Sequence, residues 1–117
     1  MKKIATLFIA LFCTAGLFAQ TPEEIVEKSG HTRGSTVDLT LFDMTTEKEV
    51  DMGGTFDWFG EESHPDYTGI TPEQFANRMI LRDAMLRHGF KPLDSEWWHF
   101  TLRNEPFPDT YFTFPVQ

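Results

Sequence analysis

Two short motifs, far apart in the chain, contain side chains suited to metal chemistry. The first runs Ser-Gly-His-Thr-Arg-Gly-Ser-Thr-Val-Asp from Ser29 to Asp38, and the second is Glu-Trp-Trp-His from Glu96 to His99. Two histidines and one carboxylate form a ligand set that zinc takes in catalytic centres, where three protein ligands leave a fourth position for water. The sequence therefore predicts one zinc ion per chain, bound by His31, Asp38 and His99.

A second carboxylate, that of Glu96, is left over beside this ligand set. Zinc lowers the pKa of a bound water from about 15.7 to about 7 and polarises a carbonyl, which makes amide hydrolysis the natural reaction class. Glu96 is then the candidate base that accepts the proton of this water and passes it to a departing amine. Residues three apart point to opposite faces of a regular strand. Glu96 must therefore lie at a bend that enters the strand of His99, unless the segment is helical; Trp97 and Trp98 favour the strand.

Each of these residues has a simpler interpretation when it is taken alone. A histidine in a Ser/Gly loop is usually a solvated surface residue, and a single aspartate on a strand is usually a turn or edge residue. Their occurrence together with Glu-Trp-Trp-His favours the metal site. We interpret His64 as a polar loop residue, with metal ligation as the alternative, and His88 as a C-terminal helix residue that suits the helix dipole. The arginines of the same helix are expected on its solvated face: Arg78, Arg82 and Arg87.

Several secondary-structure elements must position these side chains. Thr71-Pro72-Glu73-Gln74 has the pattern of a capping box, and Gly89 is a typical C-terminal stop, so we expect a helix from Thr71 to His88. Its apolar stripe is expected to contain Phe75, Met79 and Leu86, widened by Ala76, Ile80 and Ala84. Asp38 lies in an expected strand over residues 36–42, and His99 in one over residues 95–102.

The remaining segments are shorter or irregular. A polar turn over residues 45–48 and a strand over 49–52 are expected to form a hairpin, and residues 53–69 a long loop of the kind that often has a function. A two-turn helix is expected over residues 21–28, before the glycines of the first motif, Gly30 and Gly34, which permit His31 to fold back over its strand. The proline-rich end from Pro106 is expected to form an edge strand or a wrapping tail. The pattern indicates an α+β fold.

The first nineteen residues have the pattern of a secretory signal. Lys2 and Lys3 provide the basic start, and an apolar stretch follows that is too short to span a membrane. We expect cleavage after Ala19 and one domain over residues 20–117, in the periplasm or outside the cell; a retained anchor is the alternative. The only cysteine, Cys13, lies in the signal, which leaves the mature chain without a disulfide or sulfur ligand. Phe12 before it disfavours lipid attachment, because such signals need a small residue there.

The charge of the chain restricts its partners. The formal net charge is −8 at pH 7, and it becomes more negative when the two lysines of the signal are removed. Such a balance argues against nucleic acid and anionic membranes as partners of the mature domain.

The two motifs resemble the signature of the VanX-type D-alanyl-D-alanine dipeptidases of zinc peptidase family M15. That signature is Ser-x-His-x-x-Gly-x-x-x-Asp followed later by Glu-x-x-His. The similarity continues through Val37–Leu41, Asp51–Gly54, Phe56-Asp57, Ser63-His64, Glu105-Pro106, Tyr111-Phe112 and Phe114-Pro115. The resemblance implies that His31, Asp38 and His99 are the zinc ligands and Glu96 the catalytic base. It also implies that Ser29 and Asp57 bind the ammonium end of a dipeptide.

The resemblance implies a hedgehog/D-Ala-D-Ala-peptidase-like fold, a small antiparallel sheet with a flanking helix, truncated at the N-terminal side. Family members are roughly twice as long, and the arginine that stabilises their oxyanion lies in the other half. Arg33 is the arginine nearest to the metal motif here. The implied function is zinc-dependent hydrolysis of D-alanyl-D-alanine or related small cell-wall dipeptides. The alternative is a truncated, non-catalytic remnant that still binds zinc.

Overall fold

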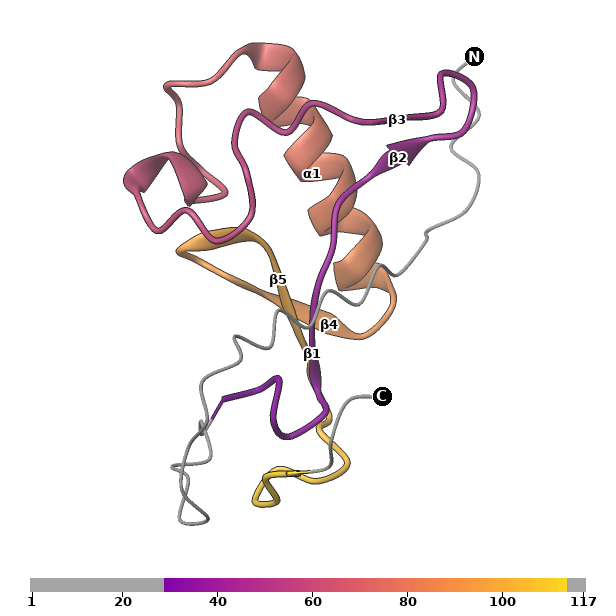
Figure 1. The fold of residues 1–117 in the computed structure, drawn as a ribbon, viewed down its shortest axis with the longest axis vertical. Coiled ribbons are helices and arrows are strands. Elements are labelled where there is room, and N and C mark those ends of the chain that lie inside the picture. The colour runs from indigo at the N-terminus through magenta and orange to yellow at the C-terminus, as the bar shows by residue number, and fades with distance from the viewer. Residues whose placement is uncertain (1–28, 114–117) are drawn as a thin grey trace, which may run out of the picture.

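The computed structural model describes residues 29–113 and has an α+β architecture with one α-helix and short antiparallel strands. Figure 1 shows helix α1 (Pro72–Arg87) lying against the main sheet, with the strands of the small hairpin to its right. The predicted signal at residues 1–19 and the predicted helix at residues 21–28 lie outside the described residues. No helix in the part of the chain that is described is both long and apolar enough to cross a bilayer.

The main sheet has three antiparallel strands in the order β1-β5-β4. Strand β1 spans Thr36–Asp38, β4 spans Phe90–Leu93 and β5 spans Glu96–Leu102. The predicted strand over residues 95–102 is thus confirmed. The strand predicted over 36–42 is too long, because the chain leaves the sheet after Asp38 and keeps only one further backbone bond, from Leu39 N to the Trp98 carbonyl at 3.0 Å.

A second sheet consists of a small hairpin. Strand β2 (Phe42–Asp43) pairs antiparallel with β3 (Lys48–Glu49), so the predicted hairpin is confirmed although its strands are shorter than expected. The polar turn is stabilised by Asp43, whose Oδ1 accepts a hydrogen bond from Thr45 N at 2.8 Å. Such side-chain-to-backbone bonds are typical of aspartate at the start of a turn.

The long segment after the hairpin is irregular, as predicted, except for a single turn of 3₁₀-helix, η1, at Glu61–Ser63. The C-terminal segment of residues 103–113 contains no strand. Instead it wraps against the loop of the first motif, which corresponds to the second of the two alternatives expected for this end of the chain.

Helix α1 spans Pro72–Arg87, and its predicted caps are present. The Thr71 hydroxyl accepts a hydrogen bond from Gln74 N at 3.2 Å, and Gln74 Oε1 accepts one from Thr71 N at 2.9 Å. Together these bonds satisfy two of the free N–H groups at the helix start. At the other end Gly89 has a φ of +88°, a conformation that favours glycine.

The face of α1 that packs on the sheet differs from the prediction. The buried residues are Arg78, Leu81 and Met85, spaced as i, i+3 and i+7. Ile80, expected at the edge of the apolar stripe, is 40% exposed. The three residues predicted at the centre of the stripe are only half-buried: Phe75, Met79 and Leu86. The prediction was wrong because it centred the stripe on the wrong face of the helix and so left out Leu81 and Met85 together with Arg78.

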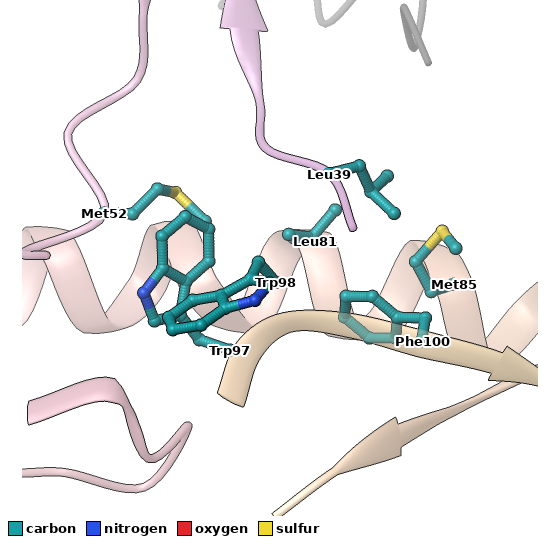
Figure 2. Close-up of a cluster of buried hydrophobic side chains, with 7 residues drawn as sticks. All are labelled: Leu39, Met52, Leu81, Met85, Trp97, Trp98 and Phe100. Carbon is teal, nitrogen blue, oxygen red and sulfur yellow. The ribbon is translucent and has the colours of Figure 1, made fainter. Parts of the chain in front are cut away.

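The hydrophobic core lies between α1 and strand β5. Figure 2 shows its seven side chains gathered between the helix, this strand and the segments that enter from the hairpin side: Leu39, Met52, Leu81, Met85, Trp97, Trp98 and Phe100. Trp97 and Trp98 are consecutive yet both belong to this core, whereas successive side chains of a regular strand point to opposite faces. The register explains this, because Leu93 pairs with Glu96 whereas Pro92 pairs with Phe100, which makes an irregularity in β5.

Candidate metal centre

The main sheet places two of the three predicted ligands directly opposite each other. Asp38 of β1 pairs with His99 of β5 in the antiparallel register, and Asp38 Oδ1 lies 3.2 Å from His99 Nδ1. His31 reaches the same carboxylate from its loop, with 3.4 Å between its Nε2 and Asp38 Oδ2. The imidazole rings of His31 and His99 meet edge to face, with 5.0 Å between the ring centres. One ligand atom from each of the three residues lies within 4.8 Å of the other two.

The polar atoms of this cluster fit a cation. Asp38 Oδ1 is buried and accepts no hydrogen bond from the described residues, because its contact with His99 lacks hydrogen-bond geometry. Buried polar atoms without a protein partner are rare in folded proteins, and those that occur often contact a bound ion or water. Two imidazole nitrogens and a carboxylate are a common donor set for zinc. The residues present therefore fit a divalent metal ion of this kind.

A compact turn brings His31 over the sheet. Its backbone bonds run from Arg33 N to the Ser29 carbonyl (3.2 Å), from Gly34 N to the His31 carbonyl (2.9 Å) and from Ser35 N to the Gly30 carbonyl (3.1 Å). Gly34 has a φ of +70°, and a Cβ added to Gly30 would lie 1.9 Å from Thr36 Oγ1. Both glycines are therefore required by the turn, as the sequence predicts.

Glu96 is the first residue of β5, at the bend where the strand begins, which confirms the predicted placement. The irregularity in this strand lets it share a side with His99, and its Oε2 lies 3.4 Å from His99 Nδ1. Burial raises the pKa of Glu96 above its ordinary value. The negative charges of Asp38 and Asp57 raise this pKa further, while His99 opposes them. A carboxyl group with a raised pKa next to possible metal ligands suits proton transfer.

The two residues assigned to the substrate ammonium lie in different settings. Asp57 is exposed in the loop after Gly53, has a φ of 58°, and is close enough to Glu96 to influence its pKa. Ser29 lies in the turn of His31, where its Oγ accepts a hydrogen bond from Thr32 N at 3.4 Å. Asp57 thus presents an exposed negative charge near the centre, while the Ser29 hydroxyl is part of the turn itself.

Arg33 does not face the centre. Its guanidinium makes a bidentate pair with Glu105, with Nη2–Oε1 and Nε–Oε2 distances of 2.8 and 3.0 Å. The other histidines lie outside the cluster as well. His88 forms the C-terminal cap of α1, and His64 contributes its backbone carbonyl to a hydrogen bond from Arg78.

Arg78 is a residue whose role the sequence reasoning missed. It is expected in solvent but is only 1% exposed. Its Nε donates to the Met52 carbonyl at 2.6 Å, and its Nη1 donates to the His64 carbonyl at 3.0 Å. It therefore joins the two ends of the loop that carries Asp57. Its spacing of three and seven from Leu81 and Met85 is the available signal, since these positions share one helix face.

An apolar groove lies apart from the metal centre, between α1 and the hairpin. Its volume is about 670 Å³, and Leu41, Phe42 and Ile80 are among the residues that line it. None of the three clustered ligands lines this groove. The candidate metal site is therefore separate from this groove.

Comparison with known proteins shows that this chain is similar to peptidases. A family model described as D-Ala-D-Ala dipeptidase, of the peptidase M15 group, matches residues 16–117. A D-alanyl-D-alanine dipeptidase of Enterococcus faecium is 45% identical over 93 residues, which cover 80% of this chain and 46% of the relative.

Two further relatives carry the same name. The Streptomyces coelicolor protein is 47% identical over 92 residues, covering 79% of this chain and 46% of the relative. The Escherichia coli K12 protein is 39% identical over 79 residues, covering 68% of this chain and 40% of the relative. The chain thus spans about half the length of the curated relatives it matches.

Proposed function

The chain belongs to the M15 peptidase family of D-Ala-D-Ala dipeptidases, and from this membership we propose that it hydrolyses D-alanyl-D-alanine, or related small cell-wall dipeptides, with zinc. One observation carries the proposal. His31, Asp38 and His99 place their ligand atoms within 4.8 Å of one another, and the carboxylate of Glu96 contacts the same His99 nitrogen as Asp38 does.

Each residue of the centre has a role in the proposal. His31, Asp38 and His99 hold one zinc ion, which when bound supplies Lewis acidity that polarises a carbonyl and acidifies water. Glu96 would accept a proton at Oε2 from the attacking water and then pass it to the leaving amine.

Two residues near the centre are proposed to bind the ammonium end of the substrate. Asp57 offers an exposed carboxylate to the ammonium group of a dipeptide, and Ser29 lies in the turn on the His31 side. A free amine distinguishes a dipeptide from an internal peptide bond, so an acidic partner for it would restrict the reaction to short substrates. The exported location that the signal pattern of residues 1–19 predicts agrees with a cell-wall substrate.

The decisive experiment follows the release of free D-alanine. Purified protein is incubated with zinc and D-alanyl-D-alanine, with a Glu96→Ala variant as the matched control. We expect release that a chelator abolishes and added zinc restores. Release no greater than that of Glu96→Ala would refute the proposal for this chain. Longer muropeptides in parallel reactions separate a dipeptidase from a carboxypeptidase of the same family.

One observation favours a second candidate, a zinc-binding protein without turnover. Catalysis of acyl transfer usually needs a donor to the developing oxyanion, and loss of one such donor costs about 10² to 10³ in rate. Arg33, the arginine closest in sequence to the first motif, is engaged by Glu105 and does not face the centre. Zinc bound at one ion per chain without any release of D-alanine would support this candidate.

A further inference from the structure

The turn that carries His31 is held by the C-terminal segment of residues 103–113. Arg33, two residues after His31, donates two parallel hydrogen bonds to the carboxylate of Glu105, at 2.8 and 3.0 Å. The side chains of this pair are only 21% and 14% exposed. Bidentate arginine–carboxylate pairs fix geometry as well as supplying energy. The pair therefore restrains where the turn can lie.

A second set of contacts ties the same turn to the far end of the segment. Phe112 N donates to the Thr32 carbonyl at 2.7 Å, and the guanidinium of Arg33 lies 5.9 Å from the centre of the Tyr111 ring. The two residues that follow His31 are thus both contacted by residues more than seventy positions away, and the bond between Phe112 and Thr32 does not involve the pair of Arg33 and Glu105.

The segment is itself fastened to the rest of the fold. Arg103 N donates to the Gly89 carbonyl at 2.9 Å, and Arg103 Nη2 donates to the Leu86 carbonyl at 3.1 Å. Further along, the rings of Phe107 and Phe112 meet edge to face at 5.5 Å, which folds the segment back on itself. Restraint can therefore pass from the end of α1 through this segment to the turn of His31.

His31 needs such support more than the other two ligands do. Asp38 and His99 lie in paired strands, where the sheet fixes their backbones. The side chain of His31 is 43% exposed and lies in a short turn. Fixing such a backbone costs conformational entropy. A turn that is held in place beforehand avoids that cost when the metal binds.

We propose that Arg33 and Glu105 are positioning residues of the metal centre, and that the C-terminal segment latches the turn of His31 in its ligating position. The proposal rests on the proposed zinc site. Coupling between two sites is reciprocal. The latch therefore strengthens zinc binding, and bound zinc in turn strengthens the hold of the turn on residues 103–113.

The test compares zinc affinity with stability. Zinc affinity is measured by competition with a chromogenic chelator for the wild type, Arg33→Lys and Glu105→Gln, with Glu49→Gln on the exposed strand β3 as the matched control. We expect zinc to bind about tenfold more weakly to the two latch variants, as is common for residues that support metal ligands. The control should bind zinc as the wild type does. The double variant Arg33→Glu/Glu105→Arg, which reverses the pair, should recover part of the affinity.

If the pair of Arg33 and Glu105 were purely structural, its variants would have a lower unfolding free energy in the zinc-free state but an unchanged zinc affinity. Denaturant titration measures this free energy separately. Hydrogen exchange supplies a second readout, because zinc should slow exchange of the amides in residues 103–113 in the wild type but much less in Glu105→Gln. Wild-type zinc affinity in both Arg33→Lys and Glu105→Gln would overturn the latch and leave the proposed function standing. A wild-type protein that binds no zinc would overturn both.

Discussion

Asp38 lies directly opposite His99 across β1 and β5, and their side chains meet at 3.2 Å. Two candidate ligands thus have their separation set by strand register, and only the third comes from a turn. Cross-strand neighbours of this kind have Cβ atoms about 5 Å apart. A single ion can therefore lie between them without any rearrangement of the backbone.

Replacement of Asp38 by asparagine should abolish stoichiometric zinc binding. Asparagine keeps the size of the side chain but removes the negative charge that offsets the cation. We therefore expect zinc affinity to fall by more than the roughly 10- to 100-fold that is typical when a residue supporting a metal ligand is changed. Metal content after dialysis, determined by atomic spectroscopy, measures the effect. His88→Ala, at the exposed C-terminal cap of α1, is the control and should retain its zinc. An Asp38→Asn protein with one zinc per chain would contradict this assignment.

Substitution of Glu96 by glutamine should separate binding from chemistry. Glutamine cannot take up the proton, so the rate of D-alanine release should fall by about 10² to 10⁴. Zinc should remain bound, because Glu96 is not one of the three clustered ligands. Kinetic assays and metal analysis on the same sample test both halves. Turnover within a factor of about three of the wild type would exclude Glu96 as the base, since general-base catalysis contributes far more than that.

Arg78→Met should destabilise the protein without weakening zinc binding. The substitution keeps the length and apolar character of the side chain but leaves the Met52 and His64 carbonyls without their buried donor. Hydrogen bonds to a charged group contribute about 1.5–3 kcal/mol each, so we expect a loss of about 3 kcal/mol in unfolding free energy. Denaturant titration of the zinc-free protein measures it. Arg82→Met, on the same helix but only half-buried, should change it by less than about 1 kcal/mol.

The stability contributed by Glu105 should depend on pH. Its hydrogen bonds to Arg33 hold the pKa of this carboxyl below the ordinary value of 4.5. A lowered folded-state pKa means that the stabilisation is complete above the unfolded-state pKa and is lost as the pH falls through the folded-state pKa.

The difference in unfolding free energy between the wild type and Glu105→Gln should therefore be constant near neutral pH and shrink below about pH 4.5. Denaturant titrations of chelator-treated protein between about pH 3 and pH 7 measure it. A difference that grows toward acid would have the wrong sign and would exclude this origin.

The sequence predicts well those elements whose ends are determined by residues close to them in the chain. Helix α1 begins after a capping box at Thr71 and ends before a glycine with positive φ, and both features act within a few residues. The bend at Glu96 is predictable as well, because Glu96 and His99 can serve one centre only if the strand departs from regular alternation.

Features that depend on distant partners are not predictable in this way. The spacing of Arg78 from Leu81 and Met85 indicates which helix face it shares, but nothing near it in the sequence indicates that the carbonyls of Met52 and His64 will converge on it. The pair of Arg33 and Glu105 spans 72 positions, and the motif containing Arg33 does not specify an acidic partner. β1 ends at Asp38, and the next residue, Leu39, packs in the hydrophobic core. The alternating pattern of residues 36–42 does not indicate that the strand ends there.

The irregularity in β5 also equips the protein with an optical reporter. It turns both Trp97 and Trp98 inward, with their rings edge to face at 5.3 Å, immediately between Glu96 and His99. The remaining tryptophan, Trp58, is 60% exposed. Fluorescence of the chain therefore combines two shielded indoles beside the candidate centre with one solvated indole, and selective quenching can distinguish them. The buried and the exposed tryptophans can thus be followed separately by fluorescence, without any added label.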